Sequence, residues 1–135
     1  MIELTLPWPQ SVNHYKKVGG LIRTKTGKMF QKRVNTNETN LFYYQVWMRV
    51  KPRIPPEGFL FRNDGTIRLY LEVDLHPPHT KRYDADNYLK VLLDSLTNAK
   101  VWADDSQVHR LLVEKKTMVE GGQVIVRISE LNRVI

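Results

Sequence analysis

The sequence contains no cysteine, and this absence narrows the chemistry that is open to the protein. Disulfide frameworks, thiolate zinc sites, iron–sulfur clusters and cysteine nucleophiles are all excluded. Long hydrophobic runs are missing as well: no stretch approaches 18 apolar residues, and neither end carries a secretion or lipidation signal. We therefore expect a cytoplasmic protein that has no membrane partner.

Acidic residues are scarce in the first part of the chain. Residues 1–53 hold ten Lys or Arg and two Glu, a net charge of +8, whereas residues 54–135 hold eleven basic and twelve acidic residues. The whole chain of 135 residues carries a net charge of +7 at pH 7. A basic region favours polyanions, and nucleic acid first among them. A solvated surface without a partner is the other interpretation of the same charges.

Hydrophobic periodicity predicts strands and helices that are intermixed along the chain. No regular βαβ repeat is present, so we predict a single α+β domain over residues 1–135, with a mixed sheet packed against two main helices. The expected strands are residues 2–6, 67–76, 106–118 and 123–130, the last two joined by a turn at Gly121-Gly122; a hairpin is expected over residues 21–32, and helices over 35–50 and 86–98.

The two predicted helices each have an apolar face. In the first, Leu41, Tyr44 or Gln45, and Met48 share a face. In the second, the buried side is expected to hold Leu89, Leu92, Leu93 and Leu96.

Several well-known motifs are absent. The sequence lacks a P-loop, an EF-hand loop, a His-Glu-x-x-His helix and a Gly-x-Ser-x-Gly elbow. The four histidines are scattered, so we do not expect zinc.

The strongest constellation is a set of aspartates. Asp84 and Asp86 lie two residues apart at the start of the second helix, where their carboxylates repel unless a cation or a proton lies between them. We expect the helix to return the chain close enough for Asp105 to join them. Three converging carboxylates suit Mg²⁺ or Mn²⁺, which promotes phosphodiester hydrolysis. Alternatively, Asp84 or Asp86 is an ordinary helix N-cap.

Lys90 lies four residues after Asp86, on the same helix face. An ammonium group there could stabilise the charge that develops on a phosphate in transit. The same residues also suit an ordinary ladder with Asp94, in which each exposed pair contributes about 0.3–0.5 kcal/mol. For a single aspartate the structural interpretation is favoured, and only the whole set beside a basic region indicates a metal-dependent nuclease.

Three blocks of sequence stand out together. They are Leu6-Pro7-Trp8-Pro9 followed by Ser11, Asn13 and Tyr15; Asp84-Ala85-Asp86-Asn87-Tyr88-Leu89-Lys90 ending in Leu93-Asp94-Ser95-Leu96; and Val101-Trp102-Ala103-Asp104-Asp105-Ser106-Gln107-Val108. In this combination and order the chain resembles the RusA-type Holliday junction resolvases, small endodeoxyribonucleases common in prophages.

The resemblance implies that Asp84, Asp86 and Asp105 are catalytic and bind Mg²⁺ or Mn²⁺, and that Lys90 is the catalytic lysine. It implies a homodimeric hydrolase, a crossover junction endodeoxyribonuclease that resolves four-way junctions by paired symmetrical nicks during DNA recombination and repair. No small-molecule substrate and no organic cofactor are expected. The expected DNA contacts are Ser11, Asn13, Tyr15, Lys16, Lys17, Lys81 and Arg82.

Two residues depart from the family pattern. Gln10 replaces an expected proline, and Tyr83 stands before Asp84 where a basic residue is expected. Tyr83 either stacks on a base or packs as a surface residue, which we favour, and the role of Asp104 stays open.

Two other functions also stay open: a general Mg²⁺-dependent nuclease on flaps or duplex DNA, and a protein that binds branched DNA without cutting it. Aspartates massed beside phosphates disfavour the pure binder.

Overall fold

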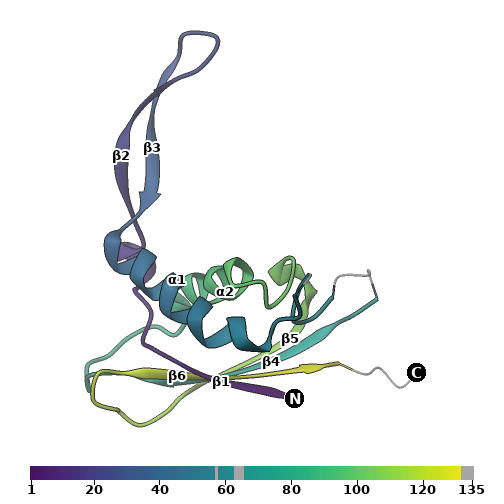
Figure 1. Cartoon of the computed structure of the whole chain (residues 1–135). Coiled ribbons are helices and arrows are strands. Elements are labelled where there is room, and N and C mark those ends of the chain that lie inside the picture. The colour runs from purple at the N-terminus through teal and green to yellow at the C-terminus, as the bar shows by residue number, and fades with distance from the viewer. Residues whose placement is uncertain (57, 63–65, 132–135) are drawn as a thin grey trace.

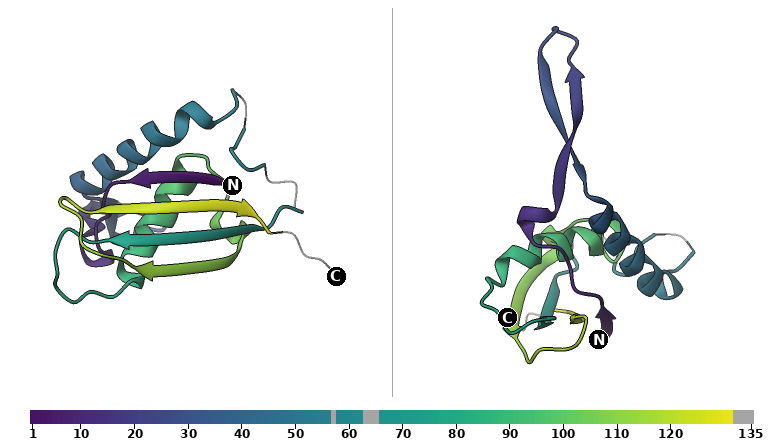
Figure 2. Two further views of the ribbon diagram at one scale, coloured as in Figure 1. Left: turned by 90° about the horizontal axis from the view of Figure 1, so that it is seen from below. Right: turned by 90° about the vertical axis from the view of Figure 1, so that its left-hand side faces the viewer.

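The computed structural model describes residues 1–56, 58–62 and 66–131. Within them, β1 (Ile2–Leu6), β6 (Gln123–Glu130), β4 (Leu69–His76) and β5 (Val108–Lys115) form one sheet in the order β1-β6-β4-β5. Strand β6 is antiparallel to both neighbours, whereas β4 and β5 are parallel, so the predicted mixed sheet is confirmed. Figure 2 shows the four strands side by side.

The helices α1 (Asn37–Val50) and α2 (Asp86–Asn98) cover the same face of this sheet (Figure 1). The strict alternation predicted for β4 explains why, because one side of that strand is fully buried while the other is partly exposed. On the opposite face, Arg127 pairs with Glu3 at 3.0 Å and with Asp74 at 2.9 Å. The core includes Leu4, Leu6, Phe42, Val46, Val50, Leu69, Leu71, Val73, Leu75, Val91, Leu92, Leu96, Val124, Val126 and Ile128.

Helix α1 confirms a predicted helix and corrects its orientation. The hydroxyl of Thr36 caps the helix by accepting a hydrogen bond from the amide of Thr39. The face that carries Leu41, Tyr44 and Met48 is exposed, and the side chains of the stripe Phe42, Val46 and Val50 are buried instead. Both stripes are apolar at helical spacing, so only packing against the sheet and α2 decides between them. In α2, all four leucines of the predicted buried face are at least partly buried. Leu92 and Leu96 are fully buried, while Leu89 and Leu93 are half-buried.

The end of α2 is closed by a Schellman motif. The amide of Lys100 donates to the carbonyl of Thr97 at 3.0 Å, and that of Val101 donates to the carbonyl of Leu96 at 3.1 Å. Lys100 itself has φ 64°, a left-handed conformation that favours glycine. Leu96 and Val101, the two positions that carry the apolar contact typical of this motif, are both buried.

Lys100→Gly should stabilise the protein, because glycine reaches the left-handed conformation without the steric cost that a Cβ atom imposes. We expect the free energy of unfolding in urea to rise by about 0.5–1 kcal/mol relative to Lys100→Ala, which keeps that cost. Equal stabilities of the two variants would contradict this explanation of the helix end.

The turn predicted at Gly121-Gly122 joins strands that are not neighbours, because β4 lies between β5 and β6. The connection passes over the end of β4, where the amide of Lys116 donates to the carbonyl of Leu75 at 2.8 Å and that of Val119 to the carbonyl of Pro77 at 3.0 Å. Sequence pattern alone does not specify which strands pair.

Strands β2 (Lys16–Arg23) and β3 (Met29–Asn35) form a separate two-stranded hairpin, which we call the arm (residues 16–35). The predicted hairpin is confirmed and is longer than expected. The arm stands away from the body of the protein (Figure 1). Short 3-10 turns complete the fold: η1 (Val12–His14), η2 (Lys51–Arg53) and η3 (Asp105–Gln107). In the part of the chain that is described, neither helix has the length and apolar character needed to cross a membrane.

Candidate active site

Asp84 and Asp86 lie where the loop after β4 enters α2, and both are exposed. The helix starts with backbone contacts: the amide of Asn87 donates to the carbonyl of Asp84 at 3.1 Å. Its N-cap is Ala85, and within the described residues no side chain caps it by a hydrogen bond. The two carboxylates are therefore not used as caps, and they remain available at the positive end of the helix dipole.

An aromatic cluster holds the loop behind these aspartates. The ring of Tyr83 packs edge-on against Trp8 at 5.7 Å, Tyr88 at 5.8 Å and His79 at 6.0 Å between ring centroids. The ammonium of Lys115 lies 4.5 Å from the centre of the Tyr83 ring. Tyr83 is thus half-buried among these rings, and it ties the Trp8 block of sequence to the aspartate block.

Gly122 allows the connection between β5 and β6 to press against the same cluster. Its φ is 74°, and a Cβ added there would lie 2.7 Å from the Cβ of Trp8 and 3.0 Å from the Cδ of Pro78. Glycine is required here for both conformation and space.

Asp104 and Asp105 have different roles in η3. The carboxylate of Asp104 accepts a hydrogen bond from the backbone of Gln107, whose buried side chain in turn accepts from the backbone of Asp104. This capping box assigns Asp104 a structural role. Asp105, in the first turn, is half-buried. Trp102, three residues before Asp105, is fully buried, and its Nε1 donates to Thr97 Oγ1 at 2.6 Å. This contact anchors the segment that carries Asp105.

Within one chain, the described residues do not bring Asp105 together with Asp84 and Asp86 as a group that could hold a metal ion. Because α2 connects two parallel strands, it starts at the end of β4 and leads back to the beginning of β5. Its 13 residues separate its two ends by about 20 Å at 1.5 Å per residue. Across the described residues, no group of three or more His, Asp or Glu side chains is arranged to hold a metal ion.

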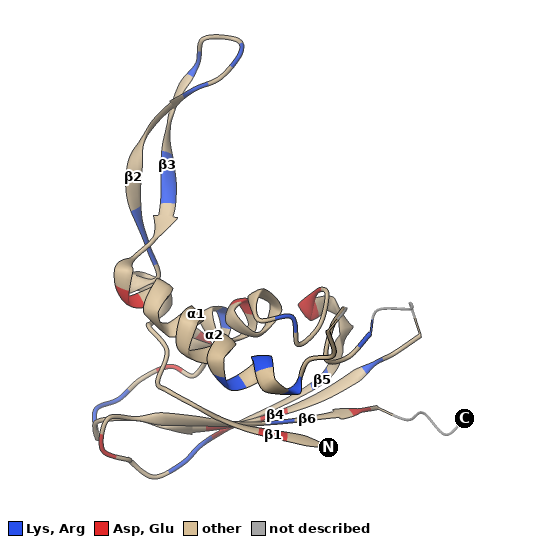
Figure 3. Cartoon of the chain, in the orientation of Figure 1, with Lys and Arg blue, Asp and Glu red and all other residues tan. Residues whose placement is uncertain are grey.

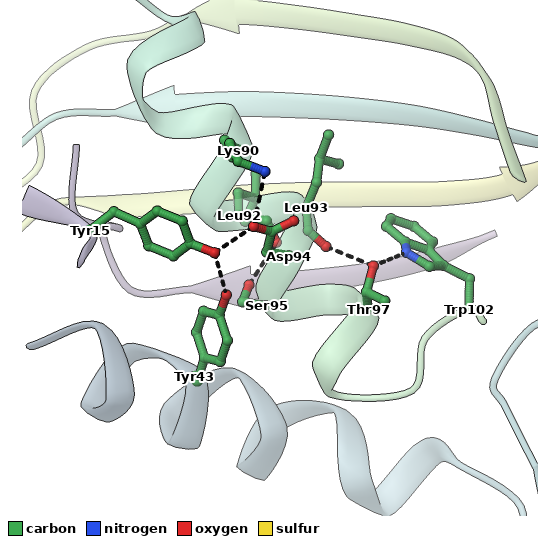
Figure 4. Close-up of polar contacts among 9 residues, drawn as sticks. All are labelled: Tyr15, Tyr43, Lys90, Leu92, Leu93, Asp94, Ser95, Thr97 and Trp102. Carbon is green, nitrogen blue, oxygen red and sulfur yellow. Dashed lines mark hydrogen bonds and ion pairs between the residues drawn. The ribbon is translucent and has the colours of Figure 1, made fainter. Parts of the chain in front are cut away.

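Lys90 belongs to a network on the outer side of α2, drawn in Figure 4. Its ammonium lies 3.4 Å from Asp94 Oδ2, and the same carboxylate oxygen accepts a hydrogen bond of 2.5 Å from the hydroxyl of Tyr15. The hydroxyl of Tyr43 lies 3.1 Å from that of Tyr15. Asp94 therefore contacts Lys90 and Tyr15, and Tyr15 in turn links it to Tyr43 of α1. The ladder interpretation holds for the Lys90–Asp94 pair, which is exposed and contributes little to stability.

Tyr15 is buried, with 6 % exposure, and burial followed by its hydrogen bond to Asp94 raises the pKa of its phenol. Burial also raises the pKa of Tyr43. The Tyr15 side chain is thus committed to packing, although it was expected to contact DNA. The remaining expected contacts fall on two segments. Around the root of the arm, Ser11 precedes η1, Asn13 lies in it, and Lys16 and Lys17 begin β2; Lys81 and Arg82 precede Tyr83.

Tyr15→Phe should lower the free energy of unfolding at neutral pH by about 1–2 kcal/mol, because Asp94 loses a hydrogen bond made to a charged acceptor. Since the folded-state pKa of Tyr15 is raised, its contribution is complete below roughly pH 10 and is lost as the pH rises further. Urea unfolding of both proteins, followed by circular dichroism from neutral to alkaline pH, measures this. The difference between wild type and variant should shrink as the pH rises, and a constant difference would refute the assignment.

The residues at the start of α2 are typical of enzymes that cleave phosphodiesters with a divalent cation: exposed aspartates, a lysine one turn further, and cations on the approaching loops. Residues 5–129 match the family described as Endodeoxyribonuclease RusA, and the chain belongs to this family.

Three curated relatives are each named crossover junction endodeoxyribonuclease RusA. The relative from Enterobacteria phage 82 is 27% identical over 128 residues, covering 95% of this chain and 93% of the relative. The relative from Escherichia coli strain K12 is 28% identical with the same coverage. A relative from Enterobacteria phage HK97 is 40% identical over 67 residues, half of this chain and 56% of the relative.

Sequence reasoning did not find the role of Asp94 as a junction between three elements. The i,i+4 spacing from Lys90 suggested only an ion pair. Tyr15 and Asp94 are 79 positions apart, and no local pattern links two residues at that separation.

Proposed function

We propose that this protein is a homodimeric, divalent-metal-dependent crossover junction endodeoxyribonuclease that resolves four-way DNA junctions by paired nicks. Membership of the RusA family over residues 5–129 supports the reaction class. The observation that carries the proposal is the exposed aspartate pair at the start of α2, which the helix itself does not use. As a single domain of the cytoplasm, the protein would act on DNA directly, without a small-molecule substrate.

The aspartates fit a divalent cation as two half-sites. Asp84 and Asp86 form one half-site, and Asp105 forms the other at the far end of α2. Carboxylate oxygens are the ligands that Mg²⁺ and Mn²⁺ prefer. When bound, such a cation would lower the pKa of water and offset the charge on the phosphodiester.

A second copy of the chain would bring the half-sites together. β5 is the edge strand of the sheet, and its Leu111 and Leu112 are exposed. Asp105 begins η3, which directly precedes β5, whereas Lys115 at the other end of β5 contacts Tyr83, the neighbour of Asp84. A two-fold axis that sets two β5 edges antiparallel would therefore place Asp105 of each copy near the aspartate pair of the other. Two equivalent sites would then serve two strands of a junction.

Lys90 stands one turn after Asp86 and would donate to an oxygen of the scissile phosphate, stabilising the charge that develops there. Asp94 would keep the ammonium on this side of the helix through their ion pair. The phosphate backbone would be held by Ser11, Asn13, Lys16, Lys17, Lys81 and Arg82.

Mixing two inactive variants tests the shared site. Asp86→Asn removes one half-site and Asp105→Asn the other, so each variant alone should fail to cut a synthetic four-way junction in Mg²⁺. In a mixed dimer, one site combines both substitutions and the other combines two intact halves. Co-refolding the variants should therefore restore nicking of one strand in about half of the dimers, which the cut and uncut strands on a denaturing gel measure.

The mixing test can be contradicted, and further measurements separate the alternative functions. A mixture that stays inactive while wild type cuts would mean that each site is built within one chain. Wild type that cuts linear duplex of the same sequence equally well would favour the general nuclease, and junction binding without cutting in either metal would leave the pure binder. EDTA should abolish cutting, and light scattering should give twice the 15.9 kDa chain mass.

Lys90→Ala should bind junctions nearly as wild type does and cut them roughly 100-fold more slowly, since removing one charge-stabilising donor typically costs 10²–10³ in rate. Single-turnover assays in Mg²⁺ measure cutting, and binding is measured in EDTA, where cutting is blocked, so the two effects are separated. Lys51→Ala, which removes an exposed lysine from η2, is the matched control and should cut normally. Normal cutting by Lys90→Ala would remove this residue from the mechanism.

A further inference from the structure

The arm concentrates one kind of charge on a part of the fold that has no core of its own. Its 20 residues contain seven Lys or Arg and no acidic residue, a third of the 21 cations in the chain. Figure 3 shows these cations along both strands and the tip. Nearly every residue of β2 and β3 is exposed, so packing against the body does not explain this composition.

The arm is nevertheless a defined structure. At its tip, the amide of Thr24 donates to the carbonyl of Lys28 at 2.8 Å, and the amide of Gly27, whose φ is 84°, donates to the carbonyl of Thr24 at 2.9 Å. Along the strands, Ile22 lies opposite Phe30, and such an apolar cross-strand pair stabilises a hairpin. The hydrogen bonds of the tip and the cross-strand pairing thus give the arm a defined register, with one irregularity between Val18 and Gly20.

Two large apolar residues near the tip are not used by this pairing. Leu21 lies opposite Gln31, and Met29 lies opposite Arg23. Their exposures are 65% and 53%. Proteins that deform DNA use the same combination: apolar side chains contact the bases, and the neighbouring cations neutralise the phosphates.

The root of the arm lies beside the candidate catalytic lysine. Tyr15, which directly precedes β2, is hydrogen-bonded to the carboxylate that pairs with Lys90, as Figure 4 shows. DNA that lies along the arm therefore passes close to the start of α2. At about 3.3 Å per residue, the eight residues of β2 span roughly 25 Å, well beyond the roughly 8.5 Å depth of the major groove.

We infer that the arm is the element that recognises the branch point of the DNA. Its cations hold phosphates of two neighbouring duplexes of the junction, and Leu21 and Met29 pack against bases that the junction leaves unstacked. This inference rests on the proposed function and names the part of the chain that selects branched over linear DNA. A second copy of the arm is a poor occupant, because two arms with seven cations and no anion repel each other.

Two double variants separate charge from apolar contact. Lys25→Ala with Lys28→Ala should weaken binding to a four-way junction and to linear duplex alike. The slope of log Kd against log salt should fall by about 2, because each phosphate contact contributes about 0.9. Leu21→Ala with Met29→Ala keeps the Ile22–Phe30 pair; it should weaken junction binding roughly tenfold and duplex binding less than about twofold, with an unchanged salt slope.

The controls use the protein's own surface. Leu41→Ala with Met48→Ala removes the same two side-chain types from the exposed face of α1 and should change neither affinity. Because the chain has no cysteine, Thr26→Cys carries a single photo-cross-linker at the exposed tip, and its cross-links should fall on nucleotides next to the branch point.

Binding is measured in EDTA, and wild-type cutting in Mg²⁺ is followed in parallel, so a failure of the nuclease function is seen separately. Equal loss on junction and duplex for the Leu21 and Met29 variant, or cross-links confined to duplex ends, would overturn the branch-point role. Unchanged affinity of the Lys25 and Lys28 variant would remove the arm from the DNA interface. A fall in the mass of either variant by light scattering would make the arm a contact between copies, which also overturns the inference.

Discussion

The parallel pairing of β4 with β5 is the constraint on which the rest of this structure depends. Parallel neighbours need a crossover, and here the crossover is α2, which must run back along the sheet. Its start therefore carries Asp84 and Asp86 at one end of the sheet, while its far end leads to Asp105 at the other. In the proposed function each chain would supply two half-sites, and this gives the proposed dimer a chemical reason.

The packing around the start of α2 shows how distant parts of the sequence support one site. Trp8 contacts the rings of Tyr83 and Tyr88, and Gly122 lets the last connection of the sheet close over the same indole. The loop that carries the aspartates is thus braced from behind by apolar contact, while its outer face stays polar. Such bracing limits the movement of the two carboxylates without using either of them in a hydrogen bond to the helix start.

Charge is divided in space as it is along the chain. Seven of the ten cations in the first 53 residues lie on the arm, whereas Asp84, Asp86 and Asp105 lie on the body, so the two kinds of charge do not neutralise each other. Asp94 is the point where the two regions meet, because it contacts Tyr15 at the root of the arm and Lys90 on α2. An arm anchored there would deliver phosphates to the lysine while keeping its own cations away from the acidic residues.

Local patterns in the sequence were enough to predict most of the elements and the family of this protein. Alternation over β4, the bounds of α2 and the Lys25-Thr26-Gly27 turn were all predictable, because they depend on neighbours within a few residues. The aspartates, Lys90 and the family resemblance were predictable for the same reason. Tertiary structure decided which face of α1 is buried, that β6 lies between β1 and β4, and that Asp105 lies far from Asp86. These outcomes depend on strand pairing and helix direction, which arise from contacts between residues far apart in the chain, and periodicity carries no record of such contacts.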